Sequence, residues 1–127
     1  MTLEQVKEIL KAEVLVGQES LGLEVKMVCG ADLLSDVLAF TKSESLLLTG
    51  LTHPQVIRTA EIAEITAICF VRGKRPSDET VELAQEKGVP VLCTSLLMYE
   101  ACGRLYSHNV PGCSQAGGTI NAQENTT

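Results

Sequence analysis

A short, mostly apolar run followed by small polar residues and then an amphipathic stretch occurs four times between residues 24 and 107. The apolar runs lie at residues 24–29, 46–48, 67–71 and 89–93, a little over twenty residues apart. Aliphatic strands of this kind are buried on both faces, and strands that alternate with helices connect by right-handed crossovers. The pattern therefore predicts an α/β fold: a mostly parallel sheet with flanking helices.

Polar residues that precede the amphipathic stretches are candidate helix N-caps, whose side-chain oxygens accept hydrogen bonds from free backbone N–H groups. They are Asp32, Thr52, Ser77 and Ser95. The helix after Asp32 is expected to bury a stripe made of Leu33, Leu34, Val37 and Leu38.

The N-terminal part of the chain adds one helix and one strand to this pattern. Thr2 and Gln5 have the spacing of a capping box at the start of a helix. A short strand at residues 14–16 and a turn at residues 17–22 follow. The first two strands of the chain could pair as an antiparallel edge of the sheet.

Length and composition fit one globular domain with an aliphatic core. The chain has 127 residues, of which 45% are hydrophobic, 20% charged and 3% aromatic. A net charge of −6 argues against nucleic acid as a partner, because such binders need a basic face. No apolar run approaches the ~20 residues of a membrane span, and the N-terminus lacks a secretion signal. We therefore expect a cytoplasmic protein without a membrane partner.

Gly, Ser, Gln, Asn and Thr dominate the sequence from Pro111 onward, and Ile120 is its one large aliphatic residue. Such a segment buries too little apolar surface to offset its ordering entropy. We expect a domain at residues 1–109 and a flexible polar tail at residues 110–127.

The five cysteines show no metal-site or disulfide pattern. None is spaced C-x-x-C, and neither histidine has a cysteine at finger-like spacing, so no metal or cofactor is expected. Most of them fit as small apolar residues. Cys29 is the exception, since it lies at a strand end that faces a helix start.

Candidate binding residues gather where the predicted strands end, because the carboxyl ends of parallel strands share one edge and helix N-termini there can bind anions. Arg72, with the basic residues that follow it, makes a phosphate or nucleotide the expected ligand. The structural alternative is that these residues are ordinary caps and turns. The candidates are Cys29, Gly30, Asp32, Thr49, Gly50, Thr52, His53, Arg72, Gly73, Thr94 and Ser95.

Catalysis has little support in the sequence. The chain contains neither a G-x-x-x-x-G-K-[ST] phosphate loop nor a G-x-S-x-G elbow. Cys29, His53 and Asp32 could assemble into a nucleophilic set, although nothing in their spacing demands it.

Four segments carry a family resemblance: GADLLSDVLA (30–39), LTGLTHPQV (48–56), FVRGKRP (70–76) and EACGRLY (100–106). With them the chain resembles a stand-alone DRTGG-domain protein over residues 1–108, although it lacks the literal signature that names the family. The resemblance implies a fold similar to the N-terminal domain of HPr kinase/phosphorylase. It also implies a non-catalytic regulatory, ligand-sensing and dimerisation module, with a link to energy or hydrogenase metabolism.

The expected homodimer has a candidate surface at Leu96, Leu97, Met98 and Tyr99, although core positions explain each of them equally well. Two alternatives share the fold. One is a binding protein for a phosphorylated metabolite or nucleotide at the sheet edge, and the other is a cysteine-dependent enzyme using Cys29.

Overall fold

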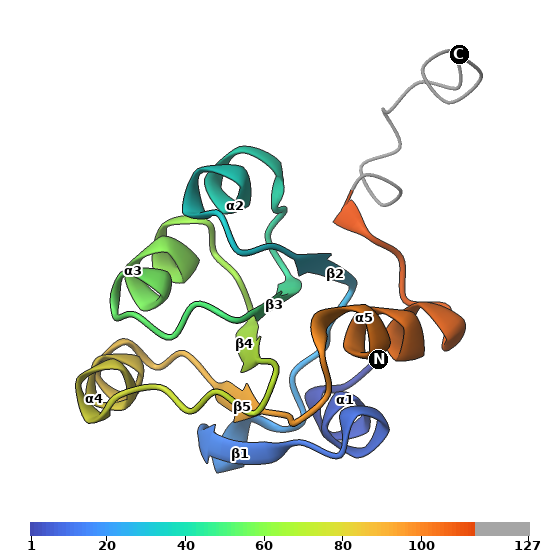
Figure 1. Cartoon of the computed structure of the whole chain (residues 1–127), viewed down its shortest axis with the longest axis horizontal. Helices are drawn as coiled ribbons and strands as arrows, with labels where there is room; N and C mark the ends of the chain where they lie inside the picture. Colours follow the sequence, from blue (N-terminus) through green and yellow to red (C-terminus); the bar gives the residue numbers. More distant parts are fainter. Residues whose placement is uncertain (114–127) are drawn as a thin grey trace.

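A five-stranded sheet forms the centre of the molecule in the computed structural model, which describes residues 1–113 (Figure 1). In chain order the elements are α1 (Leu3–Leu10), β1 (Glu13–Val16), the 3-10 helix η1 (Gln18–Ser20), β2 (Met27–Gly30), α2 (Leu34–Phe40), β3 (Ser45–Thr49), α3 (Gln55–Ile62), β4 (Ala67–Phe70), α4 (Asp78–Lys87), β5 (Val91–Cys93) and α5 (Met98–Ser107).

The strand order is β1-β5-β4-β3-β2, and β2 to β5 run parallel to one another. The predicted α/β class with a mostly parallel sheet is confirmed. The pairing predicted for the first two strands is wrong, because β1 and β2 lie at opposite edges. β1 supplies the antiparallel edge by pairing with β5, with Glu13 opposite Cys93.

Helices cover both faces of the sheet: α1 and α5 lie on one side, and α2, α3 and α4 on the other (Figure 1). Alternate residues of each central strand enter the two cores, as the pleat requires. Leu46 and Leu48 of β3 pack in the α1–α5 core, whereas Leu47 packs in the α2–α4 core. The strands are therefore buried on both faces, as their aliphatic sequences predict.

Two of the predicted caps are confirmed. The Gln5 backbone N–H donates to Thr2 Oγ1 at 3.2 Å, and the Thr2 N–H donates to Gln5 Oε1 at 2.9 Å, which completes the capping box of α1. Ser77 Oγ accepts from the Thr80 N–H at 3.3 Å and caps α4.

The other three predicted caps are wrong. The N-cap positions of α2, α3 and α5 are Leu33, Pro54 and Leu97, none of which makes a side-chain cap. Each helix begins one or more residues later than predicted, because the intervening loop residues bond to neighbouring loops of the sheet edge. Asp32 and Thr52 thus have other partners, described below, and Ser95 lies in an exposed loop.

The apolar stripe predicted for α2 is also only partly buried. Val37 is fully buried and Leu34 packs against the core, but Leu33 and Leu38 are 58% and 49% exposed. Phe40, at the end of the helix, is 67% exposed. This seven-residue helix packs mainly on α3, so it has little surface against which to bury a second row of side chains.

Residues 110–113 belong to the folded domain rather than to a flexible tail. The Val28 N–H donates to the Pro111 carbonyl at 3.0 Å, and Val28 forms a parallel bridge with Gly112. Val110 and Cys113 are buried. The domain boundary predicted at residue 109 is therefore too early, and the rest of the predicted tail, residues 114–127, lies outside the described residues.

Within residues 1–113, no helix combines the length and apolar character that a membrane crossing requires.

Two leucine-to-alanine substitutions test this assignment of the core. Leu47→Ala should lower the free energy of unfolding by about 2–5 kcal/mol, because it opens a cavity in a fully buried strand. Leu38→Ala should lower it by less than about 1 kcal/mol, because that side chain is half exposed. Urea denaturation measures the free energy of unfolding of both variants. Equal decreases would show that Leu38 of α2 is as much a core residue as Leu47.

Candidate functional site

The carboxyl ends of β2, β3, β4 and β5 lie along one edge of the sheet, because the four strands are parallel and in register. The loops that follow them make this edge, here called the rim. All eleven predicted site residues belong to these strand ends and loops, and hydrogen bonds join the loops to one another.

Asp32 joins the β2 loop to the end of β3. Its Oδ1 accepts a hydrogen bond from the Gly50 N–H at 2.7 Å and another from Thr49 Oγ1 at 3.1 Å. Thr49 Oγ1 in turn accepts from the Leu51 N–H at 3.1 Å. The carboxylate thus occupies the place where an external anion would meet the N–H groups at the end of β3.

The backbone N–H groups at the start of α3 likewise donate hydrogen bonds to acceptors within the chain. His53 Nδ1 accepts from the Gln55 N–H at 3.1 Å, and the His53 carbonyl accepts from the Val56 N–H at 3.0 Å. The Thr52 carbonyl accepts from the buried Thr80 hydroxyl at 2.7 Å, which ties this loop to α4. Thr52 and His53 therefore hold the loop in place, and those N–H groups are not open to a phosphate.

Arg72 and Gly73 form the corner of a tight turn after β4. Both have a φ of 67°, and the Lys74 N–H donates to the Val71 carbonyl at 3.3 Å, as in a type I′ turn. A non-glycine residue in this left-handed region costs about 1–2 kcal/mol. The turn is held by the β5 loop, since the Arg72 N–H donates to the Leu96 carbonyl at 2.7 Å.

The strained turn directs the Arg72 side chain over Gly50. A Cβ placed at Gly50 would lie 2.8 Å from Arg72 Nε, so a side chain at this position would require the guanidinium to move. In the part of the chain that the structure describes, the guanidinium forms no hydrogen bond or ion pair, and Arg72 is exposed. It is therefore a cation of the rim that remains available to an anion, as is the exposed Lys74 of the same loop.

Thr94 is structural. Its hydroxyl donates to the Leu10 carbonyl at 2.7 Å and accepts from the Leu96 N–H at 3.2 Å, in a buried setting. These bonds fasten the β5 loop to the end of α1. Ser95, the next residue, is exposed at the rim.

Cys29 lies apart from the groups with which it could form a nucleophilic set. Thr41 Oγ1 donates to its Sγ at 3.1 Å, so the thiol lies near the end of α2. Burial raises the pKa of the Cys29 thiol, which the Thr41 hydrogen bond only partly opposes. Cys29, His53 and Asp32 each bond to a different group, and the predicted set is not assembled.

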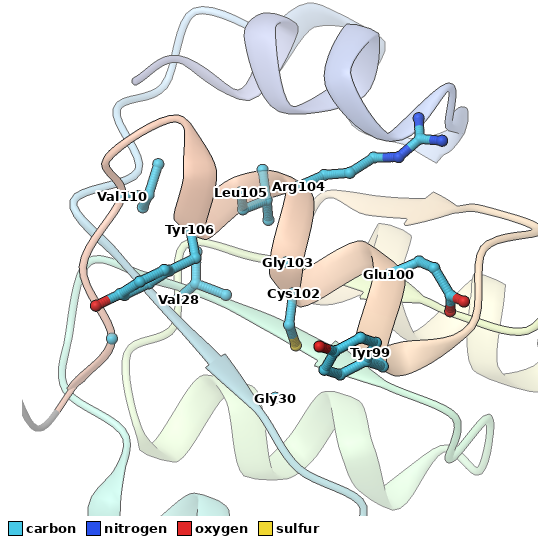
Figure 2. Close-up of a pocket in the computed structure, with 11 residues that line it drawn as sticks. Val28, Gly30, Tyr99, Glu100, Cys102, Gly103, Arg104, Leu105, Tyr106 and Val110 are labelled. Carbon is cyan, nitrogen blue, oxygen red and sulfur yellow. The ribbon is translucent and has the colours of Figure 1, made fainter.

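A groove between α5 and β2 is the feature that sequence reasoning missed (Figure 2). Its volume is about 530 Å³, and Gly30 is the one predicted site residue in its wall. Figure 2 shows Tyr106 beside Val110 and Tyr99 near Cys102, while Arg104 points away toward α1. The lining residues are Val28, Gly30, Tyr99, Glu100, Cys102, Gly103, Arg104, Leu105, Tyr106, Val110 and Gly112.

A signal for this groove exists in the sequence. Tyr99, Cys102, Gly103 and Tyr106 have the spacing of one helical face, and a tyrosine pair on such a face is typical of contact surfaces. The sequence does not predict the groove because one of its walls, residues 110–112, falls in the predicted flexible tail.

Comparison with known proteins places the chain in a family. The model of the DRTGG domain matches residues 5–107, and the chain belongs to that family. A similar fold occurs in the CBS and DRTGG domains of the regulatory region of Clostridium perfringens pyrophosphatase, solved with the activator diadenosine tetraphosphate. The TM-score is 0.67 at 19% identity, covering 80% of this chain and 44% of that one. No curated protein matches the chain.

Removing the Asp32 carboxylate, which accepts hydrogen bonds from Gly50 and Thr49, tests this link between the β2 loop and the end of β3. Asp32→Ala should lower the free energy of unfolding by about 1–3 kcal/mol, because the N–H of the buried Gly50 loses its partner. Asp32→Asn keeps an oxygen in the same place and should recover most of the loss. Urea unfolding measures both variants, and an alanine variant as stable as the parent chain would refute the link.

Proposed function

We propose that this chain, as a member of the DRTGG domain family, is a non-catalytic regulatory module that works as a homodimer through the face formed by α5 and β2. The observation that carries the proposal is the groove of about 530 Å³ on that face, lined by two exposed tyrosines, Tyr99 and Tyr106. The fold similarity to a regulatory region agrees with a regulatory role. The expected link to energy or hydrogenase metabolism rests on the resemblance alone and is not part of the proposal.

The side chains around the groove are unusually open to solvent. In the groove lining Tyr99 is 85% exposed and Tyr106 61%, and Leu97, at the start of α5 but outside the lining, is 56% exposed, although each presents a large apolar surface. Leu96 and Met98, which belong to the surface predicted from the sequence, pack against the core instead. The candidate interface therefore centres on the outer face of α5. Tyrosine is enriched at such interfaces because it contributes contact area together with a polar tip.

The α5 face can pair with a second copy of itself. A two-fold interface requires a self-complementary surface. Tyr99 and Tyr106 lie on this face on either side of Gly103, so two antiparallel α5 helices that cross at Gly103 would bring Tyr99 near Tyr106 of the second copy. Gly103 lets the helices approach, since open space surrounds the place of its missing side chain.

The cysteines support a role without catalysis. Burial raises the pKa of Cys29, Cys93 and Cys102, so none of these thiols is activated as a nucleophile. The cysteines among residues 1–113 are all free, as is usual for a protein of the reducing cytoplasm, where we place the chain.

A substitution at Gly103 tests the dimer. Gly103→Arg should weaken self-association at least tenfold, because it places a long charged side chain in the middle of the proposed interface. The fold should be kept, since arginine favours a helix more than glycine does. Light scattering coupled to size-exclusion chromatography at several concentrations measures the association.

Gly22→Arg is the matched control. Gly22 also has open space around it and lies outside the groove lining, so the same change there should leave the dimer intact. A Gly103→Arg variant that associates as tightly as the parent chain would remove α5 from the interface.

A second candidate function is the binding of a small anion, such as a nucleotide or phosphorylated metabolite, at the rim. The observation that favours it is the unpaired Arg72 guanidinium, which a strained turn holds over Gly50. The similar regulatory region, which binds diadenosine tetraphosphate, supports a polyphosphate as the first ligand to test.

Replacing Arg72 with glycine should separate stability from binding. Arg72→Gly should raise the free energy of unfolding by up to about 1 kcal/mol, because glycine adopts a positive φ without strain. The same variant should lose binding of diadenosine tetraphosphate and of pyrophosphate in calorimetric titrations. Lys74→Ala, an adjacent charge that does not cover Gly50, should change the affinity less than about threefold.

The anion candidate fails in either of two cases. One is that the parent chain binds neither polyphosphate, and the other is that the Arg72→Gly variant binds them as well as the parent does.

A further inference from the structure

We propose that Cys29 and Cys113 form a reversible disulfide that fastens residues 110–113 to β2. Only its effect on the dimer face, described below, rests on the proposed function. The bond would make the groove wall sensitive to the thiol redox state of its surroundings.

Backbone pairing puts the two cysteines next to each other. Val28 and Gly112 form a parallel bridge, and the Val28 N–H donates to the Pro111 carbonyl. Cys29 and Cys113 are the next residues along these two paired segments, so their side chains leave the same face. Paired strands lie about 4.8 Å apart, within the Cα separation of roughly 4.4–6.8 Å that a disulfide spans.

The side chains also meet. Burial raises the pKa of the Cys29 thiol, and the Cys113 thiol lies close enough to it, near the end of α2, to contribute to this increase. Cys113 Sγ lies 3.5 Å from Ser45 Oγ and 4.0 Å from the Val28 carbonyl oxygen. A disulfide could therefore close here without rearrangement of the sheet.

The remaining cysteines are poorer partners for Cys29. Cys102 packs in the core on the α5 side of the sheet, whereas Cys29 packs on the α2 side. Cys69 is fully buried in β4, and the Cys93 thiol donates to the Lys74 carbonyl at 3.4 Å. Cys102 therefore serves as a matched control position.

The disulfide would fix one wall of the groove. Val110 and Gly112 line the groove opposite α5, and the Val28–Gly112 bridge joins this segment to β2. A covalent bond at Cys113 would hold the wall in the form seen here before a second copy arrives. The wall is then already ordered before the second copy binds, so less conformational entropy is lost on association. The oxidised chain should therefore associate more tightly.

A low-molecular-weight disulfide is the oxidant that the step requires. The Cys29 thiolate attacks one sulfur of the oxidant, whose S–S bond breaks, and one small thiol leaves. The Cys113 thiolate then attacks Cys29 Sγ in this mixed disulfide and releases the second small thiol. The two protons from the cysteines end on the two released thiols, so two cysteines are oxidised and one small disulfide is reduced. Burial, which raises the pKa of Cys29, should make the first attack slow.

The test uses the full chain incubated with oxidised and reduced glutathione in varied ratio. After alkylation and proteolysis, mass spectrometry should find a peptide pair joined through Cys29 and Cys113, lighter by two hydrogens. Cys29→Ser and Cys113→Ser should abolish this pair, and Cys102→Ser should keep it. The oxidised chain should melt at least about 5 °C higher, since the bond closes a long loop.

Two results would overturn the disulfide: a joined pair that contains Cys102 instead, or free thiols at Cys29 and Cys113 under strongly oxidising ratios.

Sedimentation of the reduced and oxidised chains separates the two proposals. We expect the oxidised chain to dimerise about fivefold more tightly. Equal association of both forms would overturn the redox effect on the groove. If neither form associates, the proposed dimer is wrong. The disulfide is tested separately, by whether mass spectrometry finds the peptide pair joined through Cys29 and Cys113.

Discussion

Burial of the central strands on both faces is the constraint that shapes the whole molecule. The side chains of β3, β4 and β5 are almost entirely shielded by the two helical layers, and the aliphatic cores they form are the main source of stability. Within residues 1–113, neither face of β3, β4 or β5 is left for a ligand or a partner. Binding must therefore use the rim, the groove between α5 and β2 or the outside of the helices.

The rim corresponds to the edge at which parallel α/β sheets commonly bind ligands, but here side chains of the protein itself accept hydrogen bonds from its N–H groups. In parallel α/β sheets, N–H groups at strand ends and helix starts commonly receive anions. Here the Asp32 carboxylate accepts a hydrogen bond from the Gly50 N–H, and His53 Nδ1 accepts one from the Gln55 N–H. Arg72 is the exception, because a strained turn keeps its guanidinium exposed and unpaired among the described residues. The groove beside α5 is another opening available for binding.

The sequence predicted what depends on local pattern and missed what depends on distant contacts. Aliphatic runs at regular spacing were enough for the parallel sheet, and the Thr2–Gln5 and Ser77 caps are local. Asp32 resembles a cap in sequence, but its partners lie 17 and 18 residues away. The composition of residues 110–113 predicts a tail. These residues are ordered because Gly112 pairs with Val28 at the edge of β2, a contact between residues far apart in the sequence. The groove needs both α5 and this segment, so no local pattern could define it.

The central claim is that α5 and β2 form a face for a second copy of the chain. Sedimentation equilibrium of the purified, reduced chain over a range of micromolar concentrations tests it most directly. If the chain dimerises, the measured mass should rise with concentration to twice that of one chain. A mass that stays at one chain over the whole range would contradict it.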